Sequence, residues 1–161
     1  MNIELDAHDL ALLEHLQHDS RMSQSELGEQ IHLSTAAVNR RLKRLKEHNI
    51  IQRYSVVLTP EAVGYPLTIV VQIEAESERI DLLDMMKHSF AACPYVQQCY
   101  YVTGEWDFIL ILTIQDMTQY TLLTRQLFFQ NNNVKRFKTL VAMHRVKTGL
   151  EIPLNGNIRL F

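Results

Sequence analysis

At 161 residues, with 47% hydrophobic and 21% charged residues, the chain has the length and composition of a soluble globular protein of one domain or two small ones. Its longest apolar runs have only the length of a strand and its first residues lack the pattern of a signal peptide, which excludes a membrane span and predicts a cytoplasmic protein. The net charge of −2 looks unfavourable for binding DNA, and the two cysteines, Cys93 and Cys99, are too few for a disulfide framework.

A first helix is predicted over about residues 7–18. Asp6 can cap its start by accepting a hydrogen bond from a backbone N–H group that has no partner within the helix. Leu10, Leu13 and Leu16 recur with helical spacing, so we expect this side of the helix to face a core.

Two further helices joined by a tight turn are predicted between residues 23 and 47. Ser23 and Glu26 have the spacing of a capping box, which indicates a helix that opens there. Ser34 can cap the next helix. His32 would occupy the turn between them, where a left-handed backbone favours Gly but tolerates His.

The last of these helices has one apolar and one basic face. Val38, Leu42 and Leu45 fall at positions i, i+4 and i+7 and form a stripe that can pack against the preceding helices. The stretch 38–47 also carries five cations and one acid. A basic stripe can lie on an otherwise acidic protein, so net charge is the wrong scale on which to judge DNA binding.

The basic face has the chemistry of a recognition helix that enters the major groove of double-stranded DNA. Small side chains at its start allow close approach, Asn can pair with adenine, Arg can pair with guanine, and further cations can neutralise phosphates. The residues predicted to contact DNA are Ser34, Thr35, Ala36, Asn39, Arg40, Arg41, Lys43 and Arg44. The alternative is an ordinary solvated helix face that binds nothing.

After this helix, residues 50–58 alternate enough to predict a strand, either a wing or a linker strand. Thr59-Pro60 and the Gly and Pro of 63–66 then interrupt the pattern. We therefore expect a winged helix-turn-helix domain over 1–52, a linker strand over 53–65 and a second domain over 66–161.

From residue 66 the pattern changes to strands interleaved with two helices. The predicted strands cover 67–74, 96–103, 108–114 and 134–146, and the helices cover 79–91 and a segment from about 116. The helix side chains expected to face inward are Ile80, Leu83, Met86, Phe90, Tyr120, Leu123 and Leu127. Asn155-Gly156 indicates a C-terminal extension or hairpin.

This order predicts a ferredoxin-like βαββαβ arrangement, in which right-handed crossovers place both helices on one face of an antiparallel sheet. Residues 108–112 are apolar on both faces, and further apolar groups come from Val70, Tyr100, Val102 and Val141. Both faces of the sheet are apolar, but the helices cover only one of them, which implies that a second copy of the chain covers the opposite face. We therefore predict a homodimer with two recognition helices. The alternative is that the N-terminal domain or the C-terminal tail covers that face within one chain.

The most unusual stretch of the second half is 101–107. Gly104 permits a positive φ, backbone N–H groups left free at such a turn can bind a carboxylate, and Asp107 could receive an ammonium group. An α-amino acid carries both charges at short separation. The alternative is a simple hairpin turn made by these two residues, with Trp106 covering an edge.

Three segments together carry a family resemblance. They are LDAHDLALLEHLQHDSRMS at 5–23, HLSTAAVNRRLKRLKEHNIIQRYSVVLTPEAVG at 32–64, and VTGEWDFIL at 102–110. They resemble the leucine-responsive regulator/AsnC family of bacterial and archaeal transcription regulators. His32 and Asn49 stand where the family usually has Gly, and both residue types accept a left-handed backbone, so we expect the fold to survive.

The resemblance implies an α+β protein, with a winged helix-turn-helix domain followed by a ferredoxin-like βαββαβ sandwich domain for effector binding and oligomerisation. Proteins of this kind commonly bind an amino acid or related small molecule at interfaces between such domains, near the G-x-x-D turn, and assemble from dimers into octamers. The effector-binding residues implied are Tyr101, Thr103, Gly104, Asp107, Tyr120, Thr139 and Val141. Effector binding would favour one assembly and so change the spacing of the recognition helices.

Enzyme motifs are absent from the sequence. The seven histidines are scattered, and there is no HExxH, P-loop, nucleophile elbow or dinucleotide fingerprint. We therefore expect no catalytic residue, no metal site and no cofactor. Two other functions stay open at this point: a DNA-independent metabolite-sensing or partner-binding oligomer, and a ferredoxin-like small-molecule enzyme.

Overall fold

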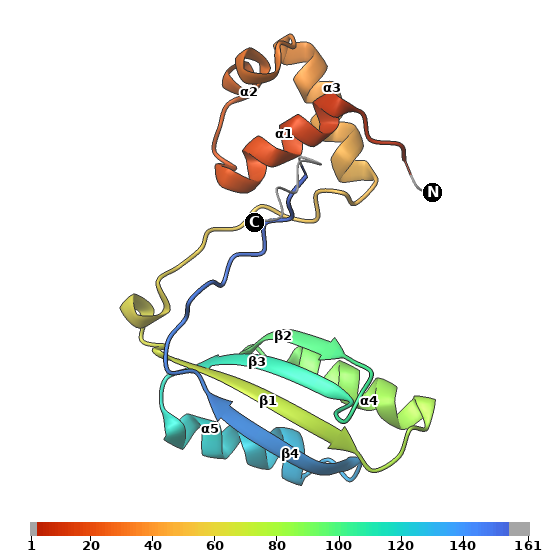
Figure 1. Ribbon diagram of the computed structural model, residues 1–161, viewed down its shortest axis with the longest axis vertical. Coiled ribbons are helices and arrows are strands. Elements are labelled where there is room, and N and C mark those ends of the chain that lie inside the picture. The colour runs from red at the N-terminus through yellow and green to blue at the C-terminus, as the bar shows by residue number, and fades with distance from the viewer. Residues whose placement is uncertain (1–2, 155–161) are drawn as a thin grey trace, which may run out of the picture. The chain divides into compact units, whose positions relative to one another are not determined.

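The chain forms two compact units in the computed structural model, which describes residues 3–154 (Figure 1). Residues up to 56 belong to the first unit together with the segment that begins at 148, and residues 57–147 form the second. Gln17 holds the returning segment, because its side chain donates to Ile152 O at 3.0 Å and accepts from Ile152 N–H at 2.7 Å. Residues 148–154 therefore pack with the first unit, and the predicted domain bounds of 1–52 and 66–161 stay a prediction.

The extension or hairpin predicted at 155–156 lies outside the described residues. In the part of the chain that is described, no helix has the length and apolar character needed to cross a membrane.

Among its described residues, the first unit has three helices, α1 (Ala7–His18), α2 (Gln24–Ile31) and α3 (Thr35–Glu47). Asp6 caps α1 as predicted, and Ser23 and Glu26 form the predicted capping box of α2. The three predicted core residues of α3 are buried. Helix starts and the inner face of α3 therefore follow from the sequence pattern, because both depend on residues within one or two turns of each other.

The turn between α2 and α3 combines a left-handed residue with a close backbone approach. His32 has φ 56° and ψ 43°, the conformation expected for the turn residue. A Cβ added to Gly28 would lie 2.4 Å from Leu33 O, so only Gly fits at that point of α2. Asn49, just after α3, also has φ 56°. Both positions at which the family resemblance expects Gly are therefore left-handed, as predicted.

The predicted inner face of α1 is wrong in part. Leu13 and Leu16 are half-buried and pack against the core of the first unit, as predicted, whereas Leu10 is half-buried and lies outside that core, and Leu12, which was not predicted, is fully buried. The buried line of α1 runs through Asp9 and Leu12, one turn apart. The reason is that the Asp9 side chain bonds to arginines of α3, which turns this side of α1 toward α3.

The strand predicted over 50–58, as a wing or a linker strand, is not formed in the described structure. Residues 52–59 have no regular secondary structure, and the side chains of Val56 and Val57 are 81% and 97% exposed. A strand needs a neighbour to pair with its N–H and C=O groups, and none of the described strands pairs with this segment. Alternating hydrophobicity alone therefore did not produce a strand. A short 3₁₀ turn, η1 (Pro60–Val63), follows and ends at Gly64 with φ 85°.

The second unit confirms the predicted βαββαβ order. Its elements are β1 (Leu67–Ala75), α4 (Ile80–Ala92), β2 (Val96–Tyr101), β3 (Phe108–Ile114), α5 (Met117–Thr124) with a π-helical continuation η2 (Arg125–Phe129), and β4 (Val134–Val141). The antiparallel sheet has the strand order β2-β3-β1-β4, and α4 and α5 cover the same face of it (Figure 1).

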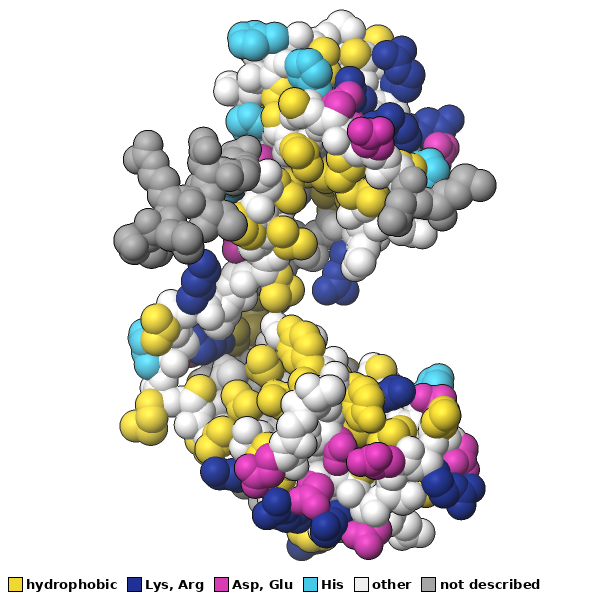
Figure 2. Space-filling view, turned by 45° about the vertical axis from the view of Figure 1, so that its right-hand side comes forward, with side chains coloured by type: hydrophobic (Ala, Val, Ile, Leu, Met, Phe, Trp, Pro, Cys, Tyr) yellow, Lys and Arg dark blue, Asp and Glu magenta, His cyan; other side chains and the backbone are white. Residues whose placement is uncertain are grey.

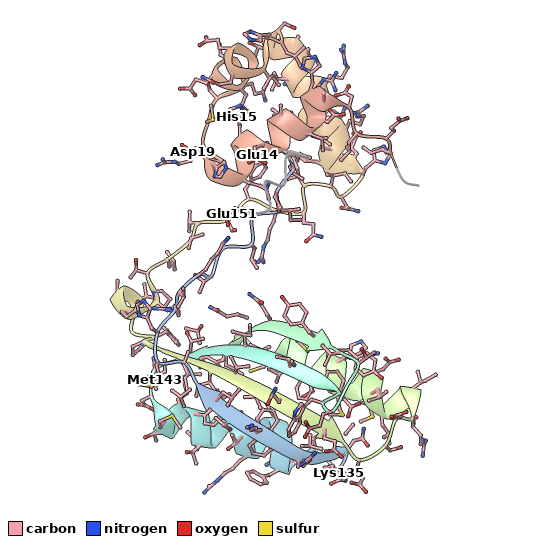
Figure 3. All side chains as sticks on the ribbon, viewed as in Figure 1. Glu14, His15, Asp19, Lys135, Met143 and Glu151 are labelled. Carbon is pink, nitrogen blue, oxygen red and sulfur yellow. The ribbon has the colours of Figure 1, made fainter. Side chains whose placement is uncertain are left out.

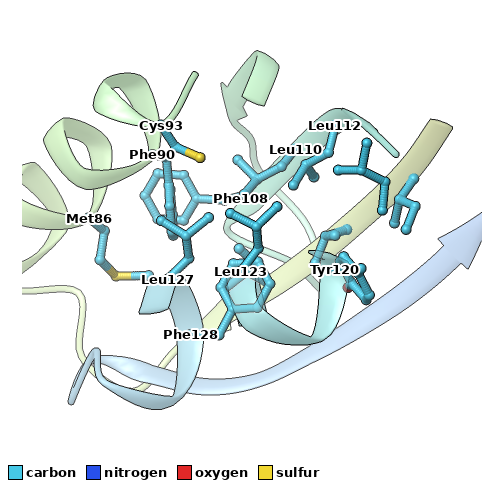
Figure 4. Packing of buried hydrophobic residues seen from close by; sticks show 14 of the residues in the cluster. Met86, Phe90, Cys93, Phe108, Leu110, Leu112, Tyr120, Leu123, Leu127 and Phe128 are labelled. Atoms are coloured by element: carbon cyan, nitrogen blue, oxygen red, sulfur yellow. The ribbon is translucent and has the colours of Figure 1, made fainter. Parts of the chain in front are cut away.

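The core of the second unit lies between this sheet face and the two helices. Figure 4 shows Phe90 of α4 beside Phe108 of β3, and their ring centroids are 5.4 Å apart in an edge-to-face arrangement. Each such side chain, when fully buried, contributes about 1.5–3 kcal/mol. Six of the seven predicted inward residues are buried, and the exception is Ile80, which is 77% exposed. Ile80 is the first residue of α4 and precedes the turn that faces the sheet.

The strand β4 ends at Val141 and not at 146 as predicted. Its partner β1 begins at Leu67, and the last paired residues are Ile69 and Val141. The backbone N–H of Ala142 still donates to Thr68 O at 2.9 Å, and in this register the first residue of β1, Leu67, lies opposite Met143. The length of β4 is therefore set by the strand beside it.

The second face of the sheet is not covered by α4 or α5. Register places Val70, Ile109, Ile111 and Leu140 on this face, because each alternates with a residue that faces the helices. Val141, which was expected among these apolar groups, pairs with Ile69 and therefore lies on the helix side. The apolar centre of the uncovered face agrees with the pattern from which a homodimer was predicted.

Candidate DNA-binding face and effector site

The outer face of α3 begins with a cap and small side chains. Ser34 Oγ accepts the backbone N–H of Ala37 at 3.2 Å, which opens the helix and leaves the hydroxyl hydrogen able to donate elsewhere. Thr35 and Ala36 follow and are exposed. Asn39, one turn further on, is exposed as well. This end of α3 can therefore approach another surface closely and present one amide to it.

Two of the predicted cations remain exposed on the same face. Arg40 has no ion-pair partner among the described residues. Lys43 lies 3.9 Å from Glu47, and a pair as exposed as this is weak in water. Figure 2 shows basic side chains gathered beside acidic ones on part of the surface of the first unit. Five of the predicted DNA contacts, together with Ser34, thus share one accessible face.

The remaining two predicted DNA contacts, Arg41 and Arg44, form ion pairs within the first unit. Arg41 Nη1 lies 2.7 Å from Asp9 Oδ1 and 2.8 Å from Asp6 Oδ2. Arg44 Nη2 pairs with the other oxygen of Asp9. The hydrogen bond to Asp9, followed by that to Asp6, raises the pKa of Arg41 above its usual value. Sequence reasoning placed both arginines on a flank of the DNA-binding face and missed their partners on α1, which lie more than 30 residues away.

The Gly104–Asp107 turn joins β2 to β3 at the end of β1. Gly104 has φ 131°, in the region that favours glycine. Asp107 Oδ2 accepts the backbone N–H of Ala75 at 2.7 Å, and Asp107 N–H donates to Ile73 O at 2.9 Å. Val102 N–H closes the turn by donating to Asp107 O at 2.8 Å. One carboxylate oxygen of Asp107 is therefore used to hold the turn against β1, and the other has no protein hydrogen bond among the described residues.

A charged cluster borders this turn. Arg136 of β4 lies over the Trp106 ring, 4.8 Å from its centroid, and also pairs with Glu74 and with Glu105. Lys135 Nζ is 2.6 Å from Glu74 Oε1, and Figure 3 shows Lys135 at the start of β4. Hydrogen bonds from Lys135 and Arg136 lower the pKa of Glu74. Sequence reasoning missed this cluster, because it depends on the register that sets Glu74 opposite Arg136.

Tyr120 and Thr139 form a pair on the helix side of β4. Tyr120 Oη and Thr139 Oγ1 are 2.5 Å apart, and the tyrosine is 5% exposed. Burial raises the pKa of the Tyr120 phenol above its usual value. Val141 lies further along β4, toward the end marked by Met143 in Figure 3.

Tyr101 and Thr103 lie at the other edge of the sheet. Tyr101 packs on Phe108, with ring centroids 5.1 Å apart, and Lys87 Nζ lies 5.0 Å from the Tyr101 centroid. Since β2 and β4 are opposite edge strands, one chain does not bring Tyr101 and Thr103 together with Tyr120, Thr139 and Val141. A hollow of about 460 Å³ between η2 and β4 is lined by Phe128, Phe129, Asn131, Asn132, Val134, Lys135, Arg136 and Phe137, none of which was predicted.

Comparison with known proteins assigns both units to one family. The model of the AsnC-type helix-turn-helix domain matches residues 5–46, and the model of the Lrp/AsnC ligand binding domain matches residues 68–152. A helix-turn-helix transcriptional regulator of Sinorhizobium fredii is 42% identical over 152 residues, which cover 94% of this chain and 90% of that protein. The leucine-responsive regulatory protein of Haemophilus influenzae is 30% identical over 146 residues, which cover 91% of this chain and 88% of that protein.

Solved structures agree with this assignment. A transcriptional regulator from Neisseria meningitidis, crystallised as a complex with L-Met, has a TM-score of 0.87 and 27% identity, and the match covers 94% of this chain and 98% of that one. An AsnC family transcriptional regulator from Agrobacterium tumefaciens has a TM-score of 0.87 and 26% identity, with 93% and 97% covered. The chain therefore belongs to the Lrp/AsnC family, whose members are transcriptional regulators and not enzymes.

Proposed function

We propose that this regulator acts in the cytoplasm by placing α3 in the major groove of double-stranded DNA, and that an amino acid or related small metabolite controls its assembly and DNA affinity. The outer face of α3 carries the proposal. There a capped helix start with small side chains is followed by an exposed amide and exposed cations. This order suits close approach to base edges at the helix start and phosphate contacts further along.

Individual roles follow from side-chain chemistry. Asn39 can form two hydrogen bonds to an adenine edge, and Arg40 can form two to a guanine edge. Lys43, as a flexible point charge, suits a phosphate. Thr35 and Ala36 leave room for the helix to approach, and Ser34 can donate its hydroxyl hydrogen to a nearby acceptor.

The proposed effector site lies at an interface between chains. Two groups of the implied residues sit at opposite edges of one sheet, so a second chain is needed to bring such groups together. The free carboxylate oxygen of Asp107 can receive the ammonium group of an amino acid, and the left-handed turn at Gly104 can present backbone N–H groups to its carboxylate. The similar regulator from Neisseria meningitidis, crystallised with L-Met, supports this ligand class. We propose a homodimer, built through the apolar sheet face, that assembles further to an octamer.

DNA binding is tested by fluorescence anisotropy on duplexes that the purified full chain selects from a random pool, compared with scrambled duplexes of the same composition. We expect the N39A/R40A variant to lose the preference for selected duplexes while its mass in solution stays that of the parent. The matched control is R125A/Q126A, which removes an exposed arginine and an exposed amide from η2 and is expected to bind as the parent does. Equal binding of selected and scrambled duplexes by the parent would contradict the proposal.

Effector control is tested with the same chain and each common amino acid in turn. We expect one class of amino acid to change both the oligomer mass, measured by light scattering, and the affinity for a selected duplex, because a ligand shifts an equilibrium only by binding its states unequally. If no amino acid changes either quantity, effector control by amino acids is wrong. If an amino acid changes the mass but no duplex is preferred, the protein is a DNA-independent metabolite-sensing oligomer.

A further inference from the structure

Asp9 is a carboxylate that is fully buried in the first unit. Both of its oxygens meet arginines of α3, since Oδ1 lies 2.7 Å from Arg41 Nη1 and Oδ2 pairs with Arg44 Nη2. Oδ2 also accepts the backbone N–H of Asp6 at 3.2 Å. A buried carboxylate needs such partners in place of water, so α1 and α3 are tied together by a charged group and not only by apolar contact.

A second acid completes this cluster. Asp6 Oδ2 lies 2.8 Å from Arg41 Nη1, so Arg41 is shared by two carboxylates. The four side chains, two acids and two arginines, sum to a formal charge of zero. The side chain of Arg41 is only 20% exposed and that of Arg44 is 42% exposed. Two of the five cations of the stretch 38–47 are therefore neutralised by carboxylates of the same unit in the absence of DNA.

We propose that Asp9, assisted by Asp6, masks the charge of Arg41 and Arg44 and thereby limits the number of DNA phosphates that each recognition helix neutralises. The cations left to α3 are Arg40, Lys43 and Lys46. The proposal rests on the DNA binding by α3 proposed above, and it assigns to α1 a part in DNA selectivity.

The physical reason lies in counterion release. Non-specific affinity for duplex DNA rises with the number of phosphates that a protein neutralises, and each one steepens the salt dependence of binding by about 0.9 in the slope of log K against log salt. A guanidinium already bonded to a carboxylate has less charge to offer a phosphate. Masking therefore lowers binding to any sequence, and leaves Asn39 and Arg40, which read base edges, a larger share of the total affinity.

The main test is the D6N/D9N variant of the full chain, titrated with salt on a scrambled duplex. Asn caps a helix as well as Asp does and has nearly the same shape, so the change removes the charge and keeps one acceptor oxygen at each position, while the other oxygen becomes an NH₂ group that cannot accept a hydrogen bond from an arginine. We expect the slope to become steeper by about 0.9 to 2 for each recognition helix bound, as one or both arginines become available. Affinity for the scrambled duplex at 50 mM salt should rise several-fold, and the ratio of selected to scrambled affinity should fall.

A matched control is D19N/D81N. It also removes two aspartates that pair with arginines, Arg21 and Arg79, and it changes the net charge of the chain by the same amount. We expect its slope to stay that of the parent. An equal steepening in the control would show an effect of overall charge and would overturn the proposal.

Single variants of α3 decide the question if D6N/D9N does not fold. R44Q removes a masked cation and leaves Asp9 paired with Arg41, whereas K43Q removes the exposed cation beside it. We expect the slope to fall by about 0.9 for each helix with K43Q and by much less with R44Q. A fall with R44Q as large as that with K43Q would show that Arg44 contacts phosphate in the parent, and masking would be wrong.

The parent chain separates this proposal from the proposed function. If the parent binds duplex in a salt-sensitive way but D6N/D9N has the same slope, masking fails and DNA binding by α3 stands. If the parent shows no salt-sensitive binding to selected or scrambled duplex, both fail together.

Discussion

The carboxylate of Asp107 accepts a hydrogen bond of 2.7 Å from the backbone N–H of Ala75. These residues are 32 positions apart, and the bond fastens the turn between β2 and β3 to the end of the central strand β1. The residue that the family resemblance assigns to effector binding thus also has a structural task. It can perform both, because only one of its oxygens is engaged by the described residues.

Removal of this carboxylate is expected to destabilise the second unit. The D107A variant removes a part-buried hydrogen bond and leaves the backbone N–H of Ala75, a half-buried residue, without its partner, and an unsatisfied group of this kind costs about 1–3 kcal/mol. The measurement is urea unfolding of the full chain. The control is E105A, which removes an exposed carboxylate of the same turn and is expected to change stability by less than about 0.5 kcal/mol. Equal stability of D107A and the parent would contradict the structural task.

The left-handed residue between α2 and α3 predicts a stabilising change. A non-glycine residue at positive φ is strained by its Cβ, so H32G is expected to stabilise the first unit by up to about 1 kcal/mol, an amount reduced by the greater freedom of Gly in the unfolded chain. N49G is the matched comparison, and a smaller gain is expected there because Asn tolerates this backbone better than most residues. Thermal unfolding followed by circular dichroism measures both. A loss of stability in H32G would show that the histidine side chain has a favourable role.

The buried line of α1 predicts unequal effects of two leucine substitutions. L12A removes a fully buried side chain and is expected to cost about 2–5 kcal/mol, whereas L10A removes a half-buried one and should cost clearly less. Denaturant unfolding of both variants checks the order. If L10A costs as much as L12A, the inner face of α1 is the one that helical spacing alone predicted.

The stability of the fold at acidic pH depends in part on Glu74. Its folded pKa lies below the usual value of 4.5 because Lys135 and Arg136 bond to the charged carboxylate. The hydrogen bonds of Glu74 to these two cations therefore stabilise the fold fully above pH 4.5, and this contribution is lost as the pH falls through the lowered folded pKa of Glu74. We expect the difference in stability between the parent and E74Q to shrink as the pH falls from 7 to 3, measured by urea unfolding at each pH. A constant difference would contradict the assignment.

Features that depend on near neighbours were predicted well. The caps at Asp6, Ser23 and Ser34, and the left-handed His32, each involve groups within a few residues of each other. The strand and helix order of the second unit also followed, because alternation in strands and helical spacing in helices record which side each residue buries. The βαββαβ topology then comes from the preferred hand of crossover connections.

Features that depend on distant partners were not predicted. Arg41 and Arg44 were predicted as DNA contacts because the helical pattern gives the direction of a side chain but not its neighbours in the fold. Their shared partner, the buried Asp9, lies on another helix. Residues 50–58 have a strand-like pattern, yet no described strand pairs with them. The pairing of Glu74 with Arg136 required the register of β4 against β1.

By itself the sequence determined the helix caps, the order of strands and helices in the second unit, the family, and the apolar and basic faces of α3. The tertiary structure alone decided which cations on the basic face are compensated, where β4 ends and which implied effector residues can meet within one chain. The reason is the sequence distance between interacting groups. Hydrogen bonds and hydrophobic spacing within one helix or strand involve residues that are close in sequence. An arginine, in contrast, pairs with a carboxylate that only the folded chain brings near it.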